Sequence, residues 1–417
     1  MSNESIVNKI VKECSGPVSV FLGAGASMPI GLPDMVSFWE NAYGSDFFEN
    51  IDKPCPYLLS PRSKLAGEQI SNNEKTILRR LIQTASIGKD NISCDLEELF
   101  DYIHSCPILS ASLTNVEALK KSFYLYHTCC HSNPNTNTTY KTDFAGFKKE
   151  YAPYKSNVET WIDDVLGCIN ILRSKLYSSY LIDDNEQWLA NVNKAAECYS
   201  FLPTLFPNYL HPVLFTTNYD TVFDALEISG KLKTLNFSLQ NGTAHNSENR
   251  RYYFSLENYL KPNIENLSSL FLFRMHGSVA WERSGKRIED HFPQKHDSQA
   301  EIVEPVISKK LPQKEPFRGM YDIFKDVLQT NKVLLSIGFS FRDDAIRAIV
   351  EDELARDRNF KVICVAPPCE KVPDLDQFMT KLEKDFCDRF IWMKEYFGTP
   401  ETSEKIKESV KEILQQK

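Results

Sequence analysis

The sequence predicts an α/β fold: a Rossmann-like parallel sheet with helices on both faces and a large inserted helical subdomain. Short apolar runs alternate with helical patterns along the chain, which is typical of a doubly wound sheet. The runs lack strict alternation of polar and apolar residues, as expected for strands covered on both faces. A long segment with little strand signal, Met35 to Phe206, follows the first run and accounts for the predicted insertion.

Apolar runs of about five residues are the predicted strands of the sheet. They are Val18–Leu22, His211–Thr216, Leu270–Met275, Lys332–Ile337 and Lys361–Val365. Helical spacing of apolar residues predicts helices between and after them, at Asp344–Leu354, Asp374–Phe386 and Thr402–Leu414, with the short apolar stretch Phe390–Met393 between the last two.

The long segment after the first strand contains helical patterns and polar stretches. The patterns are Leu96–Ile103, Val158–Leu176 and Gln187–Tyr199. Polar composition predicts loops at Ser132–Thr139, Asn241–Arg251 and Ser284–Ala300. We therefore expect residues 1–34 and 207–400 to form the Rossmann-type domain, residues 35–206 to form a helical insertion, and residues 401–417 to form a C-terminal helix.

Composition narrows the class of protein. The 417 residues include 48 Lys and Arg against 56 Asp and Glu, which gives a net charge of -8 and makes direct nucleic-acid binding unexpected. No apolar run approaches the ~20 residues of a membrane-spanning helix, and no secretory signal is recognisable. The 11 cysteines have no regular spacing and are interpreted as reduced thiols. We expect a cytoplasmic protein without membrane contact.

A glycine-rich segment directly follows the first predicted strand. It reads Gly23-Ala24-Gly25-Ala26-Ser27 and continues to Gly31, Pro33 and Asp34. Small residues there let the backbone approach a pyrophosphate, whose charge the amides of a following helix would favour. The third glycine of the usual dinucleotide fingerprint is absent, and a simple tight turn is the alternative interpretation.

Polar side chains follow the second predicted strand in Thr216-Thr217-Asn218-Tyr219-Asp220. In an open α/β sheet, ligands lie beyond the carboxyl ends of the strands. The Asn218 amide suits a ribose hydroxyl or an attacking water, and Asp220 could accept from a ribose hydroxyl. Alternatively, both residues cap the helix that starts near Thr221.

Two later strand ends carry similar signals. His276-Gly277 follows the third strand, where an exposed histidine at a turn would suit a general base, although a structural histidine fits as well. Gly338 and Ser340 follow the fourth strand, where a loop would meet an adenosine or a phosphate. The structural alternative there is a turn followed by a helix cap at Asp343 or Asp344.

The order of these four motifs resembles the sirtuin (silent information regulator) family. That family has a Gly-Ala-Gly-x-Ser loop with Gly-x-Pro-Asp downstream, a Thr-x-Asn-x-Asp segment, a His-Gly pair and a Gly-x-Ser turn. The matching segments are Gly23–Ser27, Gly31–Asp34, Thr216–Asp220, His276–Gly277 and Gly338–Ser340. Each motif is weak alone, and the combination is specific.

The resemblance implies an NAD-binding domain that breaks the nicotinamide–ribose bond, with NAD as the substrate. By analogy, Asn218 would orient water or a ribose hydroxyl, His276 would take the proton, and Asp220 would fix the ribose. The residues implied to hold the dinucleotide are Gly23, Ala24, Gly25, Ser27, Asp34, Gly338 and Ser340.

Departures from the deacetylating sirtuins indicate a different acceptor. Those enzymes carry a zinc site of two Cys-x-x-Cys pairs, and this chain has no Cys-x-x-Cys. We therefore expect no zinc and no other metal, because the cluster His127, Cys129, Cys130 and His131 lacks the usual spacing too. The Asn-Tyr-Asp centre of the second motif, the segment Asp95–Leu99 and the large insertion are similar to the bacterial sirtuin-like branch of antiphage defence proteins.

Members of that branch hydrolyse NAD to ADP-ribose and nicotinamide, so the resemblance implies an NAD glycohydrolase with water as acceptor. It also implies control by homo-oligomerisation or by a partner, for which a HerA-type ATPase is the candidate. The alternatives are an ADP-ribosyltransferase on the same fold and a non-catalytic nucleotide-binding subunit that controls a partner ATPase. A dehydrogenase is disfavoured by the incomplete glycine fingerprint and by the absence of an acid about twenty residues on at a second strand end.

Overall fold

A computed structural model describes residues 3–14, 16–33, 38, 186–206, 211–261, 267–292, 300–303, 311–368 and 373–415. The chain divides into two compact units, of which the first comprises Met1–Asp34, Tyr177–Glu304 and Ser308–Lys417. The second comprises Met35–Leu176 and Pro305–Ile307. Nearly all described residues belong to the first unit. The predicted helices Leu96–Ile103 and Val158–Leu176, the polar stretch Ser132–Thr139, the segment Asp95–Leu99 and the His127–His131 cluster lie outside the described residues.

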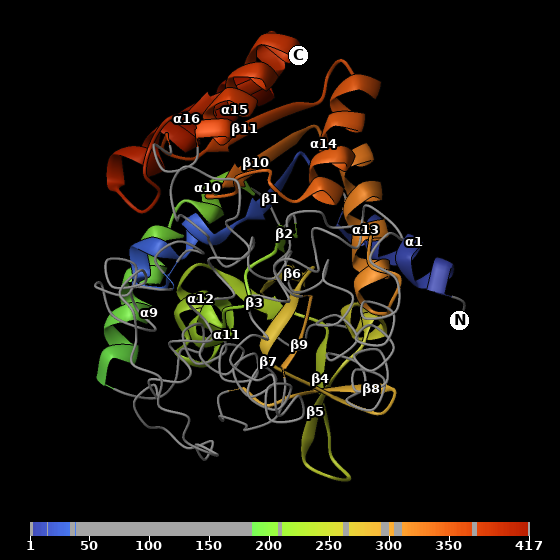
Figure 1. Cartoon of the computed structure of the whole chain (residues 1–417). Helices are drawn as coiled ribbons and strands as arrows, with labels where there is room; N and C mark the ends of the chain where they lie inside the picture. Colours follow the sequence, from blue (N-terminus) through green and yellow to red (C-terminus); the bar gives the residue numbers. More distant parts are fainter. Residues whose placement is uncertain are drawn as a thin grey trace, which may run out of the picture. The chain divides into compact units, whose positions relative to one another are not determined.

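The first unit contains a parallel sheet of seven strands in the order β12-β11-β10-β1-β2-β6-β3 (Figure 1). Every neighbouring pair in it is parallel. The five predicted strands are present, as β1 Val18–Leu22, β2 Val213–Thr216, β6 Ser268–Arg274, β10 Val333–Ile337 and β11 Lys361–Val365. The sheet also contains β3 Phe237–Gln240 and β12 Phe390–Met393, which was expected only as an apolar stretch.

Both faces of this sheet are buried, and successive residues of one strand face opposite sides. In β1, Phe21 belongs to one apolar cluster, whereas Val20 and Leu22 belong to the other. In β2, Phe215 and Leu214 divide in the same way. Because neither face is left to solvent, the strands need no polar alternation, which explains their continuous apolar runs.

Helices cover the two faces. The side of Phe21 is covered by α1 Asn3–Glu13, α13 Phe317–Thr330, α14 Asp344–Arg356 and α15 Pro373–Phe386. The other side is covered by α9 Glu186–Cys198, α10 Leu202–Leu205, α11 Val222–Ile228, α12 Lys231–Thr234 and α16 Pro400–Gln415. In Figure 1, α13, α14 and α1 lie to the right of β1 and β10, and α9 and α10 lie to the left. The architecture is a Rossmann-like α/β fold, as predicted.

The three helices predicted after the fourth strand are present as α14, α15 and α16. The pattern Gln187–Tyr199 is present as α9, whose Val192 and Ala195 pack in the apolar cluster beneath the parallel sheet. This helix therefore belongs to the first unit. No helix among the described residues is long and apolar enough to cross a membrane.

A second sheet is formed by strands on both sides of β6 in the sequence, and the sequence did not predict it. It is antiparallel, in the order β4-β5-β8-β7-β9. Its strands are β4 Thr243–Asn246, β5 Arg251–Phe254, β7 Gly277–Ser284, β8 Arg287–Asp290 and β9 Ala300–Ile302.

The expectation of loops at Asn241–Arg251 and Ser284–Ala300 is therefore wrong. The first range contains β4, and the second contains β8. These strands are only four residues long and expose much of their surface, as in β4, where no residue is buried. A half-exposed strand of this length gives no apolar run, so polar composition hides it.

Candidate functional site

The four motifs meet at the carboxyl edge of the parallel sheet. Leu22 at the end of β1 is in register with Thr216 of β2 and with Ile337 of β10. Thr216 is in register with Arg274 at the end of β6. The residues that follow these strands therefore leave the sheet at one level. The strand order reverses between β1 and β10, and open α/β sheets bind ligands at such a reversal.

The glycine loop after β1 packs directly against the loop after β10. The amide of Gly23 donates to the Ile337 carbonyl, and the amide of Gly25 donates to the Gly338 carbonyl, both at 2.9 Å. A Cβ atom on Gly23 would lie 2.5 Å from the Gly338 oxygen, and one on Gly338 would lie 2.3 Å from the Ala26 nitrogen. These glycines thus permit contact between two backbones of the protein itself.

The loop after Gly23 forms two short 3-10 turns, η1 Ala24–Ala26 and η2 Met28–Ile30. Ala24 and Gly25 are half-buried, as are Gly338 and Ser340 across the edge. Asp34, the remaining residue predicted to hold the dinucleotide, lies outside the described residues.

The Asn218 side chain is oriented by two hydrogen bonds at this edge. Its Nδ2 donates to the Gly23 carbonyl at 2.9 Å and to Oγ of Ser27 at 3.0 Å. Its backbone amide donates to Oγ1 of Thr216, which fixes the turn. Because Nδ2 has only two hydrogens, both are engaged, and the amide oxygen is the atom left to accept a ligand hydroxyl or a water.

Asp220 lies beside Asn218, with Ser27 between them. Oγ of Ser27 donates to Oδ2 of Asp220 at 2.6 Å, and the Val222 amide donates to Oδ1 at 3.2 Å. The second bond is a local turn contact one residue before the N-cap Thr221 of α11, so Asp220 does not itself cap the helix. Burial raises the pKa of Asp220, and the hydrogen bonds from Ser27 and Val222 oppose that shift.

A small cavity opens beside these three side chains. Its polar walls are Ser27, Thr216, Asn218, Asp220 and Arg274, and its other walls are Leu22, Tyr199, Phe223 and Leu272. The lining therefore comes from β1, β2 and β6, from the loops after β1 and β2, from α11 and from Tyr199 directly after α9.

Arg274 was not predicted as a site residue, although a charge at the end of an apolar run is a signal that could have found it. It is 1% exposed and forms an ion pair with Asp224 through Nη2. Its Nε and Nη1 have no hydrogen-bond partner among the described residues. Buried donors normally find a partner, so these two atoms are suited to a water or a ligand group in the cavity.

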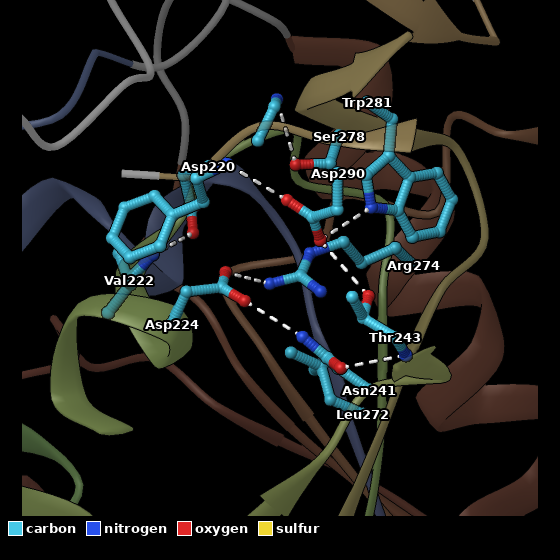
Figure 2. A network of polar contacts seen from close by, with 12 residues as sticks. Asp220, Val222, Asp224, Asn241, Thr243, Leu272, Arg274, Ser278, Trp281 and Asp290 are labelled. Carbon is cyan, nitrogen blue, oxygen red and sulfur yellow. Dashed lines mark hydrogen bonds and ion pairs between the residues drawn. The ribbon is translucent and has the colours of Figure 1, made fainter. Parts of the chain in front are cut away.

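A network of acids and amides surrounds Arg274 (Figure 2). Nδ2 of Asn241 donates to Oδ1 of Asp224 at 2.9 Å. Figure 2 shows the guanidinium between the carboxylates of Asp224 and Asp290. Burial raises the pKa of Asp224 to about 6; Arg274 opposes the shift, and the charge of Asp290 adds to it.

Asp290 connects this network to the antiparallel sheet. Its Oδ2 accepts from Oγ1 of Thr243 at 3.0 Å and from Nε1 of Trp281 at 3.2 Å. Thr243 begins β4, Trp281 lies in β7, and Asp290 ends β8. The second sheet thus supplies part of the polar wall behind Arg274.

His276 lies in the connection between β6 and β7 and is only 2% exposed. The prediction of an exposed histidine is wrong, because β7 begins at the next residue and β9 covers the turn. The Val303 amide donates to the His276 carbonyl at 2.8 Å. A Cβ atom on Gly277 would lie 2.2 Å from the Glu301 oxygen, so this position requires glycine.

Two side chains from distant elements contact the ring. Nε2 of His276 lies 3.0 Å from Oη of Tyr321 on α13 and 3.0 Å from Oδ2 of Asp343. The other oxygen of Asp343 accepts from the amides of Ala345 and Ile346 at the start of α14, which confirms Asp343 as a helix cap. The contact with His276 was not predicted, because no local pattern relates these positions.

The structure brings the predicted residues together in three groups. Asn218, Ser27 and Asp220 form one group, and Gly23, Gly25 and Gly338 form the second. His276 belongs to the third, with Tyr321 and Asp343. Thr216 and Arg274 are in register at the ends of β2 and β6. Asn218 lies two residues after Thr216, and His276 lies two residues after Arg274. Within the described ranges, no group of three His, Cys, Asp or Glu residues is arranged to hold a metal ion.

Comparison with known proteins agrees with this geometry. Residues 212–385 match the family model described as SIR2-like domain, a span that begins just before β2 and includes Asn218, His276 and Gly338. No curated protein matches the chain. SIR2-like domains are Rossmann-like and are often NAD-dependent enzymes. Over residues 212–385 the chain is therefore similar to SIR2-like domains, in agreement with the resemblance of its motifs to the sirtuin family.

Proposed function

We propose that the protein is an NAD glycohydrolase that cleaves the nicotinamide–ribose bond to give ADP-ribose and nicotinamide. The placement of Asn218 and His276 carries the proposal. Both residues stand two positions beyond a registered pair of strand ends, on the first and second strands from β1 on one side of the reversal of strand order. Open α/β sheets bind ligands at such a reversal. A module that only binds a nucleotide needs neither residue.

Cleavage of the nicotinamide–ribose bond needs no general acid from the protein. The C1′–N bond breaks and its electron pair goes to the nicotinamide nitrogen, which leaves neutral without a proton from the enzyme. The amide oxygen of Asn218 would hold the hydroxyl or water at the reacting carbon. His276 would take the proton as the new C1′–O bond forms, and would later release it to solvent.

The small cavity supports water as the acceptor. It lies against Asn218 and offers the two unpartnered donors of Arg274 together with the Asp220 carboxyl group. Such a set of donors and acceptors suits a water molecule, which makes two to four hydrogen bonds when buried. Transfer of ADP-ribose to a macromolecule would use the same residues and remains the alternative function.

The dinucleotide would lie along the carboxyl edge. Gly23, Ala24, Gly25, Ser27, Asp34, Asp220, Gly338 and Ser340 are the proposed contacts, and no zinc is required. Ser27 has the added task of holding Asp220 and Asn218 in place through its hydroxyl group.

We further propose that the activity depletes NAD in antiphage defence, in a cytoplasmic homo-oligomer that a HerA-type ATPase partner can control. This part rests on the resemblance of the motifs. A non-catalytic subunit that controls such an ATPase is the alternative if NAD binds without turnover. Co-elution of the purified protein with the ATPase tests the partner, and separate elution would count against it.

NAD consumption with product analysis tests the activity. We expect nicotinamide and free ADP-ribose from the wild type, and loss of turnover by at least ~100-fold in Asn218→Ala and in His276→Ala. His245→Ala is the matched control, because this histidine is exposed on β4. Wild-type turnover in either site variant would contradict the role given to that residue. A labelled macromolecule in place of free ADP-ribose would establish transfer.

A further inference from the structure

The Asp343 carboxylate reaches His276 from a fixed position. Its Oδ1 accepts two backbone N–H groups of α14, from Ala345 at 3.0 Å and from Ile346 at 3.1 Å. Its Oδ2 lies 3.0 Å from Nε2 of His276, at ion-pair distance. Both side chains are at most 5% exposed, so solvent screens their electrostatic interaction only weakly.

The loop that brings Asp343 to this position is held in an unusual conformation. Gly338 has φ 62°, and Phe341 has φ 55°, a value that bulky residues rarely adopt. The Phe341 ring is buried and packs against Phe339 and Phe390. Such backbone persists where packing holds it, and it is common near functional groups.

Tyr321 contacts the same nitrogen of His276, and its hydroxyl proton indicates which ring nitrogen of His276 is protonated. Burial raises the pKa of Tyr321 well above its usual value, and the charge of Asp343 and a hydrogen bond to it act in the same direction. The hydroxyl thus keeps its proton and donates it to Asp343. Its oxygen then accepts from an N–H group at Nε2, which also lies 3.0 Å from the Asp343 carboxylate.

We propose that Asp343 is a positioning residue that fixes His276 as the Nε2–H tautomer, so that Nδ1 is the atom that takes the proton. The proposal rests on the proposed function for its catalytic meaning. The two ring nitrogens of histidine differ, and the bond made by one decides which of them can act as a base. A carboxylate on the far nitrogen also stabilises the imidazolium ion that forms when Nδ1 accepts the proton.

The helix cap makes Asp343→Asn a sharp test. Asparagine caps a helix as well as aspartate does, so its oxygen stays on the two amides of α14. Its NH₂ group then replaces Oδ2 and faces Nε2 of His276. A donor there requires a lone pair on Nε2, so the proton moves to Nδ1 and the base is blocked. In serine proteases, the corresponding change lowers kcat by about 10⁴-fold while the geometry is kept.

The tautomer is measured directly by ¹⁵N NMR of the histidine side chains at alkaline pH, with the His276 signals assigned from their loss in His276→Ala. We expect the wild type to carry the proton on Nε2 and Asp343→Asn to carry it on Nδ1. NAD turnover by Asp343→Asn is expected to fall at least ~100-fold in kcat, with KM changed by less than about threefold.

Two variants serve as controls. Asp344→Asn makes the same change one residue later, at a half-exposed acid paired with Arg347, and should keep the wild-type tautomer and kcat. Tyr321→Phe removes the hydroxyl group but leaves Asp343, and should keep the Nε2–H tautomer.

The two readouts separate the proposals. A wild-type ring protonated on Nδ1, or an unchanged tautomer in Asp343→Asn, overturns the role of Asp343 whether or not NAD is consumed. The expected tautomers in a protein that consumes no NAD, even with its partner, would leave the positioning role intact and overturn the proposed function.

Discussion

Gly338 and Gly285 share one backbone conformation and differ in what lies beside them. Their φ values are 62° and 63°. A Cβ atom on Gly338 would lie 2.3 Å from backbone atoms of Gly25 and Ala26, whereas nothing lies within 4 Å of one on Gly285. We expect Gly285→Ala to cost about 1 kcal/mol, from the backbone conformation alone. Gly338→Ala should cost about 2–4 kcal/mol, because the two loops must also separate.

Urea unfolding of the two variants measures this difference. The Gly338→Ala protein, where still folded, should also bind NAD more weakly, since its contact with Gly25 sets the shape of the carboxyl edge. Equal decreases in the free energy of unfolding of both variants would mean that the close packing between the loops after β1 and β10 does not contribute to stability.

At the scale of residues, the sequence revealed those side chains whose local context is distinctive. Asn218 and His276 follow apolar strands, and their position could be predicted from parallel pairing. Asp343 could be recognised as a helix cap, but its contact with His276 depends on how α14 meets the end of β6. Arg274 and Asp224 form a pair across two elements, and pairs of this kind have no signature in a single sequence.

At the scale of elements, one side chain links the junction of α1 and β1 to the end of α13. Asn331 is 1% exposed, and its Nδ2 donates to Oγ of Ser19 at 2.8 Å. Its Oδ1 accepts from the Gly16 amide at 2.7 Å. The strands β1 and β10 both start beside this side chain, at the amino edge of the parallel sheet. The junction therefore lies at the opposite edge of the sheet from the candidate site.

Asn331→Ala should therefore destabilise the protein without altering the chemistry. The change leaves the Gly16 amide and the Ser19 hydroxyl without this partner, which costs about 2–4 kcal/mol. Thr234→Ala is the control, because its hydroxyl bonds to the Lys231 carbonyl of its own helix, and should cost less than about 1 kcal/mol. Thermal unfolding and kcat below the transition check both statements. A loss of kcat in folded Asn331→Ala would show that the two edges of the sheet are coupled.

Fully buried strands could be predicted from the sequence, whereas partly exposed strands could not. The strands β1, β2, β6, β10 and β11 are apolar along their whole length, and this signal placed them within two residues. The antiparallel strands β4 and β8 have only four residues each and are partly exposed, so they resemble polar loops in sequence. Their pairing is set by contacts such as Thr243 with Asp290, which join residues far apart in the chain.

At the scale of the whole described unit, buried charged residues from the parallel and the antiparallel sheet lie together in one cluster. Arg274 ends a strand of the parallel sheet, and Asp290 ends a strand of the antiparallel sheet. Asp224 and Asp220 approach from α11 and the turn before it. Three carboxyl groups thus surround one guanidinium, and burial favours the neutral form of at least one of them.

This arrangement predicts how stability depends on pH. Burial raises the pKa of Asp224 from 3.8 to about 6, so the folded protein binds a proton that the unfolded chain has released between these values. The stabilisation from protonated Asp224 is complete below the unfolded pKa and is lost as the pH rises through about 6. Asp224→Asn resembles the protonated form at every pH. The free energy of unfolding of the wild type, relative to this variant, should therefore fall between about pH 4 and pH 7, by on the order of 2 kcal/mol.

Urea unfolding across that pH range gives the comparison, with Asp357→Asn as the control. The hydrogen bond from Lys332 lowers the pKa of Asp357, so its contribution has the opposite sign and is lost only as the pH falls below the ordinary aspartate range. Its difference from the wild type should stay flat above about pH 5. If the wild type instead gained on Asp224→Asn as the pH rose, the charge of Arg274 would outweigh the burial of Asp224. The pair would then act as a stabilising ion pair at neutral pH, and the guanidinium would have less freedom to bind a ligand in the cavity.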